Sequence, residues 1–159
     1  MTPSAPLSVT GVDLDAIQVF EGCVAVFLPE DGKLDQLARR VNRVTRGALE
    51  RFASSEAFSK LKPGEAADLG WPAGMEATSL RVVRLDKKCT SEEARAAGAS
   101  VGKSVGPKGA LLLAGSASHV RDMALGAVLR AYKYTEMQSS DAEAPGAVTL
   151  MVSKPEQVE

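Results

Sequence analysis

Two short, uninterrupted apolar segments, residues 22–28 and 110–114, constrain the fold of this chain most strongly. Pro29 and Gly32 follow the first segment, and Pro107 precedes the second, so that residues favouring turns bound both of them. Apolar runs of this length are typical of strands that are buried on both faces. We therefore expect a sheet that is covered by helices on both sides.

Helical periodicity follows the first apolar segment. The apolar side of this expected helix carries Leu34, Leu37, Ala38, Val41 and Val44, and the other side carries Arg39, Arg40 and Arg43. Gly47 interrupts the pattern, but an apolar face continues through residues 48–52, which indicates a second helix or a kinked continuation. A strand is expected over residues 80–85, where Val82 and Val83 are β-branched.

Two more helices and a last strand complete the expected order of elements. Thr90 and Glu93 have the chemistry of a helix start, and this helix is expected to continue to about residue 105. The strongest helix begins near Ser118. Its expected polar stripe consists of His119, Asp122, Gly126, Arg130 and Lys133, and its wide apolar arc consists of Val120, Met123, Ala124, Leu125, Val128, Leu129 and Tyr132. So wide an apolar arc predicts a helix sandwiched between the sheet and a second layer. A strand over residues 148–152 completes an α/β pattern with a parallel or mixed sheet.

Charge and cysteine content narrow the classes of function. Lys and Arg total 19 and Asp and Glu total 20, so the formal net charge of −1 provides no general attraction to phosphate backbones. Nucleic acid is therefore not the expected partner. Two separate cysteines, Cys23 and Cys89, are too few for a secreted disulfide scaffold. No apolar stretch approaches the ~20 residues of a membrane span. We expect a cytoplasmic location.

One formal motif suggests nucleotide binding. Residues 97–104 match a relaxed phosphate-loop pattern that ends in Lys103 and Ser104. A working phosphate loop needs a buried strand before it and a helix after it. Here a helix is expected before the motif and a turn after it, so we expect a chance match within an Ala/Gly-rich helix.

Catalytic and metal sites are not indicated by the residue pattern. His119 is the sole histidine, and we expect a solvated or capping role for it. Cys23 lies in a buried strand, while Lys87 and Lys88 beside Cys89 could lower the pKa of that thiol. One histidine and two separate cysteines cannot form a zinc site by themselves. We therefore assign no catalytic, cofactor-binding or metal-binding residue. Trp71 is interpreted as a core aromatic, with a surface anchor for a partner as the alternative.

The end of the chain carries a helix signal. Ser153 and Glu156 have the spacing of a capping box, and Pro155 suits the first turn of a helix. Only three residues follow, which is too short for a stable helix. We therefore expect a single domain over residues 1–152 and the start of a truncated interdomain linker helix over residues 153–159. The alternative is a frayed polar tail.

The order of these pieces resembles the N-terminal domain of the cytosolic leucyl aminopeptidase family. The resemblance covers nearly the whole chain and includes the Asp31–Leu34 and Lys62–Glu65 segments. Its most specific part is the helix that carries Gly126, Leu129, Tyr132 and Tyr134. This chain departs from the family pattern at Leu125, where members commonly carry Glu, and at Thr135, Met137 and Gln138, where members commonly carry Asp, Tyr and Lys.

The resemblance implies a macro-domain-like α/β fold and a non-catalytic role in assembly and substrate access. The whole proteins of this family are hexameric hydrolases that remove N-terminal residues from peptides with zinc or manganese. Their metal site and catalytic residues belong to a C-terminal domain, so the resemblance implies that domain as the partner and no cofactor in this chain. The chain alone is not expected to be an enzyme. The alternative is a stand-alone macro-like module for an ADP-ribose-type ligand, for which only residues 102–109 could supply a glycine-rich loop.

Overall fold

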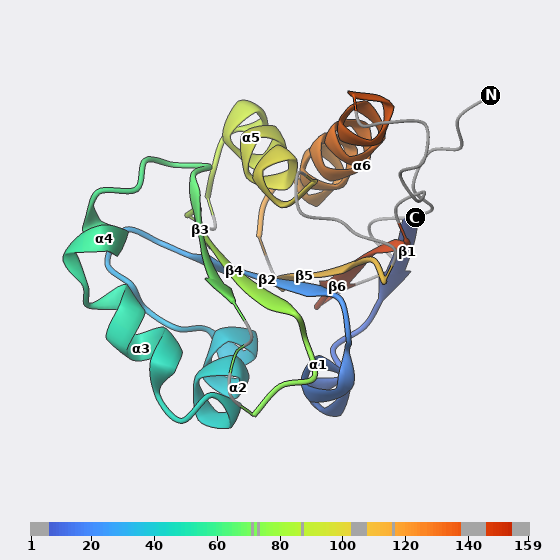
Figure 1. The fold of residues 1–159 in the computed structure, drawn as a ribbon. Helices are drawn as coiled ribbons and strands as arrows, with labels where there is room; N and C mark the ends of the chain where they lie inside the picture. The colour runs from blue at the N-terminus through green and yellow to red at the C-terminus, as the bar shows by residue number, and fades with distance from the viewer. Residues whose placement is uncertain are drawn as a thin grey trace.

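The computed structural model describes residues 7–70, 72, 74–86, 88–102, 108–115, 117–137 and 146–153. The strands in this part of the chain are β1 (Leu7–Thr10), β2 (Cys23–Leu28), β3 (Ala66–Gly70), β4 (Ser79–Arg84), β5 (Ala110–Gly115) and β6 (Val148–Val152). They form one sheet in the order β1-β6-β5-β2-β4-β3 (Figure 1). All neighbours are parallel except β3 and β4, which are antiparallel. The predicted mixed sheet is confirmed.

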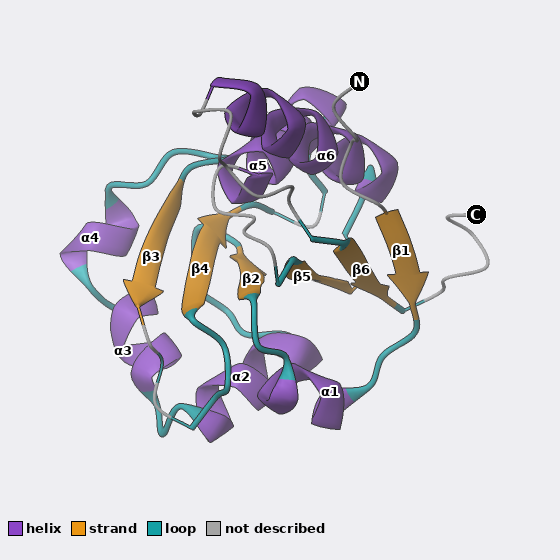
Figure 2. Cartoon of the chain, turned by 45° about the vertical axis from the view of Figure 1, so that its right-hand side comes forward, coloured by secondary structure: helices purple, strands orange, loops and turns teal. Residues whose placement is uncertain are grey.

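Helices cover both faces of this sheet. They are α1 (Leu14–Val19), α2 (Gln36–Val44), α3 (Ala48–Ala53), α4 (Glu56–Ser59), α5 (Ser91–Gly102) and α6 (Val120–Met137). Figure 2 shows α5 and α6 together on one face and α1 to α4 on the other. Two separate hydrophobic clusters fill the spaces between the layers, one on each side of the sheet. The predicted three-layer arrangement is therefore confirmed.

The two apolar segments become the central strands of the sheet. Every residue of β2 and β5 is buried. Because successive side chains of a strand point to opposite faces, Leu112 joins the cluster under α5 and α6, whereas Leu111 and Leu113 join the cluster under α1 to α4. The absence of alternation in these two segments thus reflects burial on both faces.

Local capping chemistry sets where the helices begin. Asp35 caps α2, because its Oδ1 accepts a hydrogen bond from Ala38 N at 2.9 Å. At α5, Thr90 Oγ1 accepts from Glu93 N at 3.1 Å, and Glu93 Oε1 accepts from Thr90 N at 2.9 Å. These two bonds form the reciprocal capping box. Gly47 adopts a left-handed conformation with φ of 85° and separates α2 from α3, as expected for a second helix.

Four elements were not predicted: β1, α1, α4 and β3. Strand β1 has no continuous apolar run, and strand β3 contains Asp68 and Gly70, which are residue types depleted in strands. Both are edge strands, so pairing with β6 or β4 determines their conformation more than their own sequences do. Helix α1 spans six residues and α4 only four, which is too short for a clear helical period.

The predicted burial of α6 is wrong on one side of the helix. Leu125 and Leu129, which were placed on the buried arc, are 43% and 46% exposed. Gly126, which was placed on the polar stripe, is buried against the backbone of α5, where Arg95 O would lie 2.2 Å from an added Cβ. Small residues bring one side of α6 close to α5, and another side faces the sheet. The side that carries Leu125 and Leu129 is exposed in the described structure. The helix is therefore not enclosed all round.

Two other predictions fall outside the described residues. Trp71 is one of them, and the capping box beyond Ser153 is the other. The linker helix over residues 153–159 therefore stays a prediction. Within the described part of the chain, no helix has the length and hydrophobicity that crossing a bilayer requires.

Candidate functional site

The loop that follows β2 forms a compact turn at the carboxyl end of the central strands. Pro29 O accepts a hydrogen bond from Gly32 N at 2.9 Å, and Asp31 Oδ1 accepts from Lys33 N, also at 2.9 Å. Gly32 has a φ of 74°, a conformation that glycine adopts at little cost. The chain then enters α2 through the Asp35 cap. The sequence therefore fixes both ends of this loop by local hydrogen bonds.

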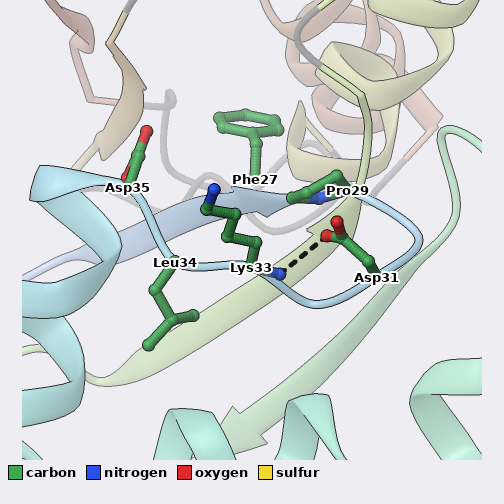
Figure 3. A pocket seen from close by; sticks show the side chains of 6 residues that line it. All are labelled: Phe27, Pro29, Asp31, Lys33, Leu34 and Asp35. Atoms are coloured by element: carbon green, nitrogen blue, oxygen red, sulfur yellow. Dashed lines mark hydrogen bonds between the residues drawn. The ribbon is translucent and has the colours of Figure 1, made fainter.

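A pocket of about 270 Å³ lies against this loop. Its lining residues are Phe27, Pro29, Asp31, Lys33, Leu34 and Asp35. Figure 3 shows the Lys33 ammonium, the Asp35 carboxylate and the Phe27 ring on one side of the loop, with Leu34 on the other. The lining thus combines apolar side chains with two carboxylates and one ammonium group. Such a mixture carries a net negative charge.

The position of the pocket follows from the sheet topology. Strand β4 lies on one side of β2, and β5, which follows β4 in the sequence, lies on the other side of β2. Open α/β sheets commonly bind ligands outside the carboxyl ends of the strands at such a switch point. Asp35 faces this point, since its Oδ2 would lie 3.3 Å from a Cβ added to Gly115 at the end of β5. Asp31, Lys33 and Asp35 were not predicted as site residues, although their place after a buried strand was a usable signal.

A second hollow of about 450 Å³ lies beside the same loop. It is lined by Asp31, Gly32, Leu34, Arg39, Asn42, Glu50, Ala53 and Ser54. Glu50 N donates to Asn42 Oδ1 at 2.9 Å, and Asn42 Nδ2 donates to Glu50 Oε2 at 3.4 Å. These bonds connect α2 to α3, so the two side chains have a structural role. Arg39 provides one cation there, opposed by two carboxylates.

The phosphate-loop pattern lies on a helix, as expected, over its described part Ala97 to Gly102. Gly98 and Gly102 face α6, where an added Cβ would lie 1.9 Å from Met123 O and 2.5 Å from Ala127 O, respectively. These glycines therefore serve close helix packing. Lys103 and Ser104 lie outside the described residues. A helix precedes the motif, so its backbone cannot form the strand-to-helix cradle that phosphates need.

Most of the glycine loop suggested for an ADP-ribose-type ligand, residues 103–107, lies outside the described residues. Of its described residues, Gly102 ends α5, and Gly109 directly precedes the amino end of β5, where Ala110 pairs with Cys23. The pocket lies at the carboxyl ends of β2 and β5. The parallel register therefore places Gly109 at the opposite end of β5 from the pocket.

The candidate catalytic residues are not brought together. His119 is half-exposed with a φ of 59°, and its Nδ1 lies 3.7 Å from Asp122 Oδ2. The Cys89 thiol is buried and donates to Ser118 O at 3.4 Å. Burial raises the pKa of Cys89, so the expectation that neighbouring lysines lower it is wrong. Burial also raises the pKa of Cys23, against the opposing effects of its Ser79 hydrogen bond and nearby Arg81. Both thiols are therefore poor nucleophiles.

The described part of the chain contains no cluster of side chains that is suited to bind a metal ion. Among residues 7–70, 72, 74–86, 88–102, 108–115, 117–137 and 146–153, no group of three or more His, Cys, Asp or Glu side chains could hold a metal ion. His119 and Asp122 are only two such groups, and structural zinc sites use four ligands. The described residues therefore do not fit a zinc or manganese centre.

Comparison with known sequences identifies related proteins. A model of the N-terminal domain of the cytosol aminopeptidase family matches residues 23–141. A probable cytosol aminopeptidase of Cereibacter sphaeroides is 44% identical over 158 residues, which cover 99% of this chain and 32% of the relative. A second one, from Dinoroseobacter shibae, is 40% identical and is matched over 33% of its length by the whole of this chain. The chain thus spans about a third of the length of the curated relatives it matches.

Comparison with solved structures confirms the fold. A tomato leucine aminopeptidase aligns with a TM-score of 0.64 at 15% identity, over 95% of this chain and 33% of that chain. A Trypanosoma brucei macrodomain in complex with ADP-ribose aligns with a TM-score of 0.63 at 11% identity, over 96% of this chain and 66% of the other. Identities this low establish the fold alone. The predicted macro-domain-like α/β fold is confirmed.

Proposed function

This chain belongs to the cytosol aminopeptidase family, whose N-terminal domain it matches, and we propose that it is the non-catalytic domain of a metal-dependent leucyl aminopeptidase. In this proposal, a separate C-terminal domain binds zinc or manganese and removes N-terminal residues from peptides. The domain described here contributes to hexamer assembly and controls access of the substrate. It does not cleave a bond.

One observation carries the proposal. The chain aligns over 99% of its own length with a probable cytosol aminopeptidase but over only 32% of that relative. Most of such a protein therefore lies beyond the matched domain, and the described residues here do not fit a metal centre. Both facts favour chemistry located in the other two-thirds of the protein. The names of the relatives also support a cytosolic location.

The proposal is tested by assaying the purified chain with leucine amide and added Zn²⁺ or Mn²⁺. We expect no hydrolysis above the buffer rate, because no described cluster can hold a metal to activate water. Hydrolysis that follows the protein through purification and is abolished by a chelator would contradict the proposal. The full-length Cereibacter sphaeroides relative is the positive control.

The alternative is a module that binds an ADP-ribose-type ligand, which the shared fold favours because the Trypanosoma brucei macrodomain was solved with ADP-ribose. The chemistry of the pocket opposes this alternative. Asp31 and Asp35 line it with only Lys33 as a cation, so a diphosphate group would meet two carboxylates. Calorimetric titration with ADP-ribose is expected to give no heat of binding. Saturable binding that Asp35→Ala alters would favour the alternative.

A further inference from the structure

The hollow of about 450 Å³ is bounded by the β2–α2 loop, by α2 and by the end of α3. We name it the α2–α3 hollow. It shares only Asp31 and Leu34 with the pocket at the switch point, and Leu34 points to the side of the loop opposite Asp35 (Figure 3). The loop and α3 approach each other at Gly32, where an added Cβ would lie 3.4 Å from the Cβ of Ala53. The volume is in the range of small-molecule sites, about 300–1,000 Å³.

Three exposed charged side chains line the α2–α3 hollow, namely Asp31, Arg39 and Glu50. In the part of the chain that the structure describes, Arg39 forms no ion pair with either carboxylate. Opposite charges that line one hollow without touching leave space between them for a ligand that carries both signs of charge. The three groups sum to a charge of −1, so a ligand with a net charge of +1 would neutralise them.

Local hydrogen bonds hold the two carboxylates in place. Asp31 Oδ1 accepts a hydrogen bond from Lys33 N at 2.9 Å, within the turn that follows β2. Glu50 Oε2 accepts one from Asn42 Nδ2 at 3.4 Å, which connects the end of the Glu50 side chain to α2. Groups that are already positioned lose less conformational freedom when a ligand binds. The hollow is therefore partly organised for binding before a ligand arrives.

We propose that the α2–α3 hollow binds a free basic amino acid, of the class of L-lysine and L-arginine. At neutral pH such a molecule has one carboxylate and two cationic groups. Its carboxylate pairs with Arg39, whose guanidinium suits planar, two-point recognition. Its α-ammonium and its side-chain cation pair with Asp31 and Glu50, and its methylene groups contact Leu34 and Ala53. This inference goes beyond the proposed function, because it makes the domain a receptor for a small molecule.

The charges of the hollow disfavour other ligand classes. A phosphate chain would meet two carboxylates and a single guanidinium. L-leucine has one cationic group, so it would leave one carboxylate without a partner. A diamine such as cadaverine has both cationic groups but no carboxylate for Arg39. The two small molecules therefore serve as probes of the separate contacts.

The test is calorimetric titration of the chain with L-lysine. The variants are Arg39→Gln and Glu50→Gln, and the matched control is Arg43→Gln, an exposed arginine one turn further along α2 that does not line the hollow. We expect each of the two variants to weaken binding about tenfold, because each removes one charge-assisted hydrogen-bonded contact. The control should bind like the wild type. L-leucine and cadaverine should each bind about tenfold more weakly than L-lysine.

Circular dichroism and thermal unfolding show whether each variant is folded, and every other result of the titrations contradicts the proposal. No saturable heat with L-lysine would remove the site. Equal weakening by Arg39→Gln and Arg43→Gln would indicate attraction to the whole arginine face of α2. Equal affinity for L-lysine and cadaverine would leave a cation site without a carboxylate contact. Equal affinity for L-lysine and L-leucine would exclude the second cationic contact. None of these results bears on the aminopeptidase role, which the leucine amide assay tests separately.

Discussion

A Cβ atom added to Gly98 would lie 1.9 Å from the carbonyl oxygen of Met123. This closeness of α5 and α6 explains why a glycine stands in the middle of α5, where it costs about 1 kcal/mol of helix propensity relative to alanine. It also explains the phosphate-loop pattern as a consequence of helix packing. The spacing of Gly98 and Gly102 is that of one helical turn along the contact.

Gly98→Ala is therefore expected to destabilise the protein despite the better helix propensity of alanine. Overpacking against backbone atoms costs about 1–3 kcal/mol or more. Urea unfolding of the variant provides the measurement. Gly70→Ala is the matched control, because nothing lies within 4 Å of an added Cβ there. Equal stability of Gly98→Ala and the wild type would show that the helices do not pack this closely.

The solvent side of α6 is expected to tolerate truncation. Leu129→Ala should cost less than about 1 kcal/mol, because about half of this side chain is already in water. Leu112→Ala in β5, where the side chain is fully buried, should cost about 2–5 kcal/mol. Chemical denaturation of both variants compares them directly. A larger loss for Leu129→Ala would mean that this face is covered within the isolated domain.

The cap of α2 is expected to contribute measurably to stability. Asp35→Ala removes the acceptor for Ala38 N and should cost about 0.5–2 kcal/mol. Asp35→Asn retains an oxygen that can cap the helix, so it should lose clearly less. Thermal unfolding of the two variants distinguishes the cap from the charge. If both variants were equally destabilised, the carboxylate charge would matter more than the cap.

Alkaline pH is expected to weaken the fold through its buried thiols. Burial raises the pKa of Cys23 and Cys89 above the ordinary value of 9.0, so the unfolded chain loses these protons first. The unfolded state then binds fewer protons than the folded state, and the unfolding free energy falls as pH rises through 9.0. The double variant Cys23→Ala/Cys89→Ala should show a smaller fall between neutral and alkaline buffers in urea titrations. An identical fall in both proteins would contradict this origin.

Much of the central fold could be predicted from the sequence because burial on both faces removes the alternation from a strand. Residues 22–28 and 110–114 showed this signal, and the Thr90 and Glu93 capping box marked the start of α5. The edge strands could not be predicted in this way, since pairing with β6 and β4 stabilises conformations that their own residues favour weakly. Edge position is a property of the whole sheet.

The surface of α6 and the pocket show what helical periodicity leaves undetermined. A wheel treats Gly126 as polar and Leu129 as apolar, yet the glycine is buried because α5 needs close approach, and the leucine is exposed. Asp31 and Asp35 both line the pocket, because the loop that carries them follows β2 at the switch point of the sheet. The periodicity of one helix cannot reveal which element packs against each of its sides.

A domain exchange in the Cereibacter sphaeroides relative tests the proposed role of this domain most directly. Its N-terminal third is replaced by this chain, and hydrolysis of leucine amide is compared with that of the intact protein and of the truncated protein. We expect the chimaera to recover the activity and assembly that truncation reduces, because this chain provides the same domain at 44% identity. A chimaera no more active or assembled than the truncated protein would contradict it, provided that the intact relative outperforms the truncated form.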